Sequence, residues 1–122
     1  DPAKIVAAIE AHVKKNCPSG VEAKFQVRQG SGAAVRARSD SKVVVSARKA
    51  YEDVTGIPCG VTLEGATIPI SNTLAKAAGA EIALMGYALP TDDIHAPNEH
   101  FGLDRFRLGF ATIGRLLARM AE

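Results

Sequence analysis

The sequence contains no tryptophan, and aromatic residues make up only 5% of its 122 positions. Surfaces that bind nucleic acids usually combine a stripe of basic residues with aromatic side chains. Here the formal net charge is only +2, and the basic residues are scattered along the chain. These absences argue against a nucleic acid as the partner.

Long apolar runs and paired cysteines are missing as well. No stretch of about 18 consecutive apolar residues exists, so no segment is predicted to span a membrane. No signal peptide is recognisable at the start of the sequence. Cys17 and Cys59 stand far apart and form no Cys-x-x-Cys motif. We therefore expect unpaired thiols in a reducing compartment, which favours a cytoplasmic protein.

The hydrophobic pattern changes character near Ser39. Before this point, a helical period predicts a helix from Pro2 to about Asn16, with Asp1 as its cap. Alternation of apolar and charged residues then predicts a strand over 21–28 and a weaker extended segment over 33–38.

After Ser39, helices alternate with strands. A capping cluster at 39–41 predicts a helix that ends at Gly56, and a second helix is predicted from about Pro69 to Ala78. Short strands are predicted at 61–63 and 81–85, and a final helix after Gly102. The final helix is predicted to bury one apolar face, formed by Phe106, Phe110, Ile113, Leu117 and Met120.

This order of elements predicts the fold class. Helix and strand alternate over 39–122 as in a parallel α/β sheet, whereas residues 1–38 combine a helix with strands in an α+β manner. Two strands make a poor sheet, and one helix with one or two strands makes a poor domain. Each part is therefore expected to be incomplete by itself.

The densest group of metal-ligand side chains lies in the connection before the final helix. Residues 92–99 place one imidazole, that of His95, and three carboxylates within eight positions, and Pro97 stiffens the segment. On spacing alone, a solvated loop is the commoner explanation for one histidine among acids. Solvation is also the expectation for Asp92 and Asp93.

Three short motifs in a fixed order add to this pattern. They are GATIPI at 65–70, ALMG at 83–86 and HAPNE at 95–99. Together they resemble the C-terminal part of the dinuclear zinc aminoacylase and dipeptidase superfamily, which includes carnosinase-like dipeptidases, glutamate carboxypeptidases and amino-acid deacylases. The resemblance covers essentially the whole chain, and HAPNE is its most specific element.

The resemblance implies a division of the chain. Residues 1–38 would be the second part of an inserted lid domain, through which these enzymes commonly form homodimers. Residues 39–122 would be the C-terminal part of a catalytic parallel-sheet α/β domain. The other metal ligands and the catalytic glutamate of the family would lie in an N-terminal segment that this sequence does not contain, so the chain alone is expected to be inactive.

The resemblance also implies roles for individual residues. His95 matches a ligand of one of two divalent metal ions, zinc in this family, and Asn98 and Glu99 match a pair that orients the loop and His95 through hydrogen bonds. Glu99 could equally cap the following helix or face water. The expected reaction is hydrolysis of a dipeptide, a small peptide or an N-acyl amino acid by a metal-activated water.

A second set of residues is expected to bind the substrate carboxylate. Gly65, Ala66 and Thr67 precede a predicted helix, where free backbone N–H groups and the helix dipole favour an anion. An ordinary N-cap by Thr67 is compatible with this role. The alternative to an enzyme is a non-catalytic binding or assembly module derived from the same fold.

Overall fold

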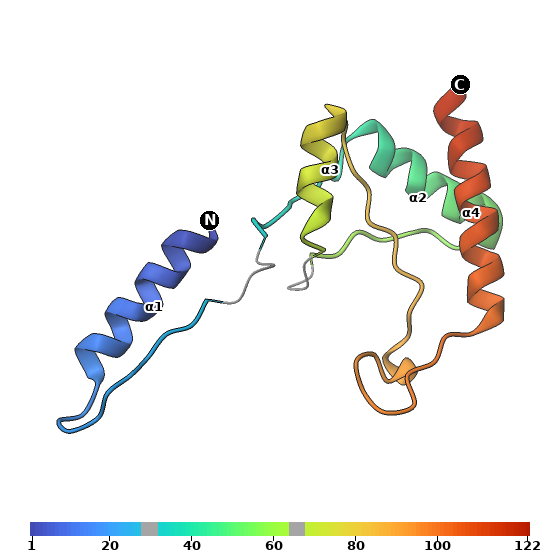
Figure 1. Cartoon of the computed structure of the whole chain (residues 1–122). Coiled ribbons are helices and arrows are strands. Elements are labelled where there is room, and N and C mark those ends of the chain that lie inside the picture. The colour runs from blue at the N-terminus through green and yellow to red at the C-terminus, as the bar shows by residue number, and fades with distance from the viewer. Residues whose placement is uncertain (28–31, 64–67) are drawn as a thin grey trace. The chain divides into compact units, whose positions relative to one another are not determined.

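The computed structural model describes residues 1–27, 32–63 and 68–122. Within these ranges it contains four α-helices and one short 3-10 helix (Figure 1). In chain order the elements are α1 (Pro2–Asn16), α2 (Lys42–Thr55), α3 (Ile70–Ala78), η1 (Pro90–Asp92) and α4 (Leu103–Ala121).

Capping residues mark the starts of α1 and α2 and the ends of α2 and α3. Asp1 accepts a hydrogen bond from the Ala3 N–H at 3.0 Å, and Pro2 occupies the first turn of α1. At the start of α2 the Ser41 hydroxyl accepts from the Val44 N–H. Gly56 and Gly79 end α2 and α3 with φ angles of 71° and 59°, a conformation that favours glycine.

The prediction of an α/β fold is wrong. In the described ranges the chain forms no strand and no sheet, so it is all-helical. Residues 21–27, 61–63 and 81–85, which were expected to be strands, carry no regular secondary structure. A strand pattern specifies a sheet only when a partner strand accepts its backbone hydrogen bonds, and apolar alternation alone does not supply that partner.

By its contacts, the chain divides into two units. The first contains Asp1–Arg36 and Gly65–Ala80, and the second contains Ala37–Glu64 and Glu81–Glu122. In the first unit α1 buries none of its residues, and its apolar residues Ile5 and Ile9 are exposed. This unit therefore has little core of its own in the described residues.

The second unit is organised by the packing of α4 on α2. Ala47 and Ala50 of α2 meet Leu116 of α4, and Ala83 and Met85 pack against them. The small alanine side chains let the two helices approach closely, and Ala50 is completely buried.

Charged side chains reinforce this helix pair. The Asp53 carboxylate on α2 accepts hydrogen bonds from Arg115 and Arg119 of α4, at 2.5 Å and 2.8 Å from their Nε atoms. These guanidinium groups hold the pKa of Asp53 well below its usual range.

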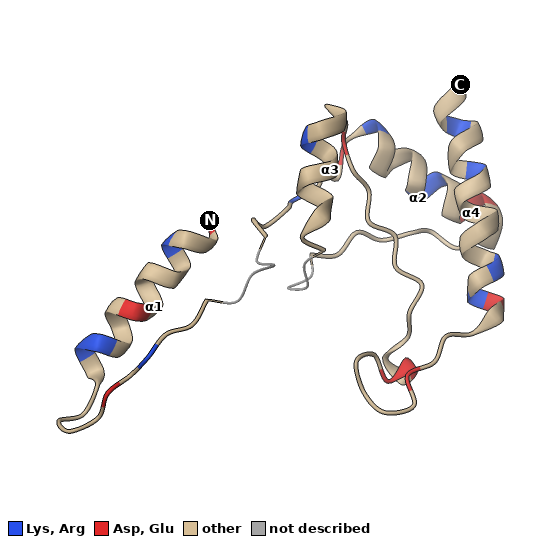
Figure 2. Cartoon of the chain, in the orientation of Figure 1, with Lys and Arg blue, Asp and Glu red and all other residues tan. Residues whose placement is uncertain are grey.

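Basic residues occur on each of the four helices, so they are not concentrated on a single helix (Figure 2).

The apolar face predicted for the final helix is not the buried one. Phe106 and Phe110 are 65% and 80% exposed, whereas Thr112 and Leu116 are buried against the rest of the unit. The exposed residues recur at alternating intervals of three and four positions, at Leu103, Phe106, Phe110, Ile113, Leu117 and Met120. Helix α4 thus has two apolar faces, of which α2 covers one.

No helix of the described residues is both long enough and apolar enough to cross a bilayer.

The packing of α4 predicts effects of different size for two adjacent leucines. Leu116→Ala should lower the free energy of unfolding of the chain by about 2–3 kcal/mol, because it leaves a cavity against α2. Leu117→Ala is the matched control and should change it by no more than about 0.5 kcal/mol, because this side chain is exposed. Urea denaturation followed by far-UV circular dichroism measures both. Equal losses would show that α4 is packed differently.

Candidate functional site

The loop that carries the HAPNE motif is closed at its base by its own backbone. The His100 N–H donates to the Asp92 carbonyl oxygen at 3.1 Å, so the two ends of residues 93–99 are held together. Nδ1 of His100 also lies 3.1 Å from the Asn98 carbonyl oxygen. Residues 93–99 therefore form a tied loop in the second unit.

Two consecutive turns shape this loop. The Ala96 N–H donates to the Asp93 carbonyl at 2.9 Å, and the Glu99 N–H donates to the Ala96 carbonyl at 3.2 Å. The third residue of each turn, His95 and then Asn98, has a positive φ, of 61° and 67°. A positive φ at this position is the geometry of a type II turn, and proline is favoured just before it, where Pro97 stands in the second turn.

The turns decide how His95 is presented. Histidine and asparagine tolerate the left-handed region better than most side chains, so both positions suit their residues. The His95 side chain is exposed on the loop. Because it is exposed, the His95 imidazole can be reached by a ligand or by another part of a protein.

Asp92 anchors the loop, and the expectation that it is solvated is wrong. It is 1% exposed. Its Oδ2 accepts a hydrogen bond from the Leu89 N–H at 2.8 Å, and its Oδ1 accepts from Nη2 of Arg105 at 2.7 Å. Nη1 of Arg105 donates to Oδ2 as well, which makes the ion pair bidentate. The neighbouring Asp93 is exposed, as expected.

Arg105 is itself held in place from several sides. It belongs to the first turn of α4, and its Nη1 also donates to the Tyr87 carbonyl at 3.3 Å. Its guanidinium carbon lies 4.8 Å from the centre of the Phe101 ring, a distance typical of a cation–π contact. The Tyr87 ring rests on Gly109, where an added Cβ would stand only 3.4 Å from the ring. The Asp92–Arg105 ion pair therefore joins the loop to α4.

The charges of this pair support one another. The Arg105 guanidinium, together with the hydrogen bond from the Leu89 N–H, lowers the pKa of Asp92 to about 2. Asp92 in turn raises the pKa of Arg105 above its usual value. Both groups are therefore charged throughout the physiological pH range.

The other residues singled out from the sequence lie in different situations. Asn98 and Glu99 are exposed on the same loop as His95, and their backbone groups take part in its hydrogen bonds. The structure thus brings these three residues onto one closed loop. Gly65, Ala66 and Thr67, the expected carboxylate-binding residues, lie outside the described residues.

The described residues do not form a complete metal site. Within 1–27, 32–63 and 68–122, no group of three or more His, Cys, Asp or Glu side chains is placed to hold a metal ion. A zinc site needs three or four ligands, and an exposed neutral imidazole suits zinc as one of them. His95 fits a zinc site only if the remaining ligands come from elsewhere.

Comparison with known proteins does not identify the chain. No protein-family model, no curated protein and no solved structure matches it.

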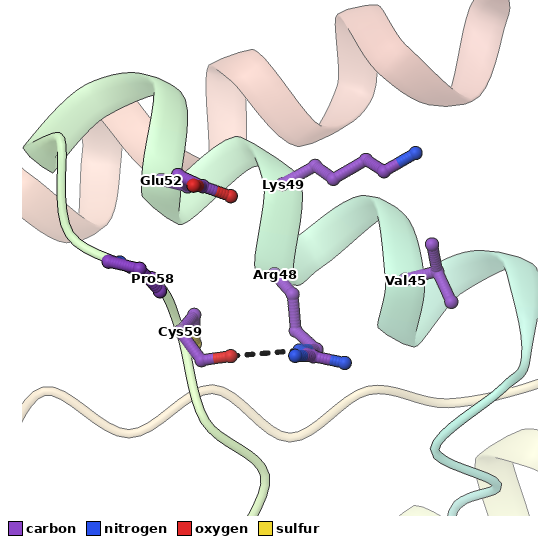
Figure 3. Close-up of a pocket in the computed structure, with 6 residues that line it drawn as sticks. All are labelled: Val45, Arg48, Lys49, Glu52, Pro58 and Cys59. Atoms are coloured by element: carbon purple, nitrogen blue, oxygen red, sulfur yellow. Dashed lines mark hydrogen bonds between the residues drawn. The ribbon is translucent and has the colours of Figure 1, made fainter.

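Two of the hollows formed by the described residues lie on the second unit. One, of about 410 Å³, lies beside the tied loop and is lined by Ala88, Asp92, Ile94, Glu99, His100 and Phe101. The other, of about 200 Å³, lies against α2 and is lined by Val45, Arg48, Lys49, Glu52, Pro58 and Cys59 (Figure 3). In the second hollow Nε of Arg48 donates to the Cys59 carbonyl at 2.8 Å, which ties the segment after α2 back onto the helix.

The lowered pKa of Asp92 predicts how the loop responds to acid. Its folded-state pKa, about 2, is below the ordinary value of 3.8. The stabilisation of the folded chain by the ionised Asp92 is therefore fully present above about pH 4. It is lost as the pH falls through about 2. An NMR titration of the Asp92 carboxyl carbon should show a midpoint near 2, and Arg105→Met should raise it. A midpoint near 4 in the unaltered chain would contradict the ion pair.

Proposed function

We propose that this chain is the C-terminal portion of a zinc-dependent amide hydrolase that acts on dipeptides, small peptides or N-acyl amino acids. One observation supports this most: His95, the histidine of the HAPNE motif, is held exposed on a closed loop with a defined backbone conformation. Loops of this kind on a rigid scaffold carry ligands and catalytic groups.

In this proposal His95 supplies one zinc ligand through a ring nitrogen. When bound, two zinc ions would supply an activated water and polarise the scissile carbonyl. The described residues contribute the position of the imidazole and the shape of the loop. The remaining ligands and the proton-transferring glutamate belong to the N-terminal segment that the resemblance implies.

The exposed face of α4 supports a partner for the chain. Phe106, Phe110 and Leu117 are more than half exposed, and they lie along one side of the helix. Contiguous apolar surface of this kind marks a site of interaction. We propose that the N-terminal segment of the same enzyme covers it. The predicted homodimer through residues 1–38 is a separate part of the proposal.

The first test is the activity of the chain by itself. Residues 1–122, purified alone and supplied with zinc, should hydrolyse neither dipeptides nor N-acyl amino acids, because the described residues hold too few ligands for a catalytic site. Release of free amino acid, measured by chromatography, checks this. Turnover at the rate of an ordinary metallopeptidase would contradict the proposal that this is a portion of the enzyme.

The second test is the role of His95 in the assembled enzyme. His95→Ala should lower zinc affinity and activity more than the roughly 10–100-fold typical of groups that only orient a ligand. His12→Ala is the matched control, because His12 is an exposed histidine on α1, and it should change neither. Zinc content by elemental analysis and peptide hydrolysis measure both variants. Unchanged zinc binding in His95→Ala would favour a non-catalytic binding module.

A further inference from the structure

The Asp92–Arg105 ion pair stands where the tied loop leaves the rest of the unit. We propose that this pair sets the position of His95 and is therefore a positioning element of the metal site. The inference rests on the proposed function for its metal side. Its structural side, that the pair holds the loop in one conformation, can be tested without any metal.

The backbone bonds explain why the pair controls the loop. The Asp92 carbonyl accepts the hydrogen bond that closes the loop, so the place of Asp92 fixes both ends of residues 93–99. His95 lies only three positions after Asp92, in the first of the two turns. A shift of Asp92 would therefore carry the imidazole with it.

The side-chain bonds explain why Asp92 stays in place. Its two carboxylate oxygens accept one backbone and two guanidinium hydrogen bonds, which fix the plane of the carboxylate as well as its distance. Arg105 is in turn part of α4, which packs on α2. The ion pair thus connects the loop to α4, whose Leu116 belongs to the one hydrophobic core cluster in the described residues of the second unit.

The geometry requires arginine at position 105. A guanidinium is planar and presents parallel N–H groups to both carboxylate oxygens, whereas an ammonium is a point charge that fixes no plane. Arg105→Lys therefore keeps the charge and removes the forked contact. It also leaves the buried carboxylate a cation, so it disturbs the fold less than a neutral substitution would.

A matched control is available in the same unit. Asp53 makes a second carboxylate–arginine cluster with Arg115 and Arg119, and it joins α2 to α4 away from the loop. Asp53→Asn weakens that cluster without touching the Asp92 pair. It separates loss of loop position from a general loss of stability.

The first arm of the experiment is hydrogen exchange on the chain of residues 1–122, read on a peptide that spans 93–100. Its Ala96, Glu99 and His100 N–H groups are hydrogen-bonded within the loop. Arg105→Lys should speed their exchange by about tenfold or more, because a charge-assisted bond at the base is lost. Asp53→Asn should leave it unchanged. If Arg105→Lys leaves the exchange unchanged as well, the inference is overturned.

The second arm is zinc affinity of the assembled enzyme, measured by competition with a chromophoric chelator. Arg105→Lys should weaken zinc binding about 10–100-fold, as expected for a group that orients a ligand, and Asp53→Asn should not. Asp92→Asn is a second variant with the same expected direction. A loosened loop with unchanged zinc affinity would overturn the positioning role, provided that His95→Ala does weaken zinc binding.

The two proposals fail in different ways. If His95→Ala leaves zinc binding unchanged, the proposed function is wrong, and the metal side of the inference falls with it. The hydrogen-exchange result is independent of that outcome. It would still decide whether the Asp92–Arg105 pair holds the loop.

Discussion

A buried carboxylate must be neutralised by hydrogen bonds and an opposite charge, and this requirement shapes the second unit. Asp92 is almost fully buried, and each of its oxygens is bonded, to the Leu89 N–H and to Arg105. Arg105 reaches it from the first turn of α4. This ion pair links the first turn of α4 to the residue whose carbonyl oxygen closes the loop that carries His95.

The helices could be predicted from the sequence because their signals are local. A capping residue, a helical apolar period and a terminal glycine act within a few positions of one another, as at Ser41 and Gly56 of α2. The strands could not, because a strand needs a partner that local sequence does not provide. Residues 81–85 read as a buried strand, yet in the structure Ala83 and Met85 instead pack beside the alanines of α2.

The exposed and buried faces of α4 show a second limit. The helical period of its apolar residues reveals a stripe through Phe106 and Phe110. Which side of α4 is buried depends on the helix that packs against it, which is α2. The helix α2 presents small side chains, Ala47 and Ala50, and these pack with Leu116. The larger stripe, through Phe106 and Phe110, is exposed in the described residues. Composition cannot decide between two apolar faces without knowledge of the neighbouring helix.

The loop could be predicted in part. The HAPNE motif singled out His95, Asn98 and Glu99, and the pair Pro97-Asn98 has the preference of a type II turn. The burial of Asp92 could not be predicted, because an aspartate beside another aspartate in a polar segment is usually exposed to water. Its partner Arg105 lies thirteen positions further on, in a helix that has other arginines. Only the fold shows which of them reaches the loop.

The proposed binding of zinc by His95 is tested most directly by a zinc-loaded crystal structure of the proposed assembled enzyme, with anomalous scattering at the zinc edge. A ring nitrogen of His95 should lie about 2.0–2.1 Å from a zinc ion. A fully occupied metal site with the His95 ring turned to solvent would contradict it.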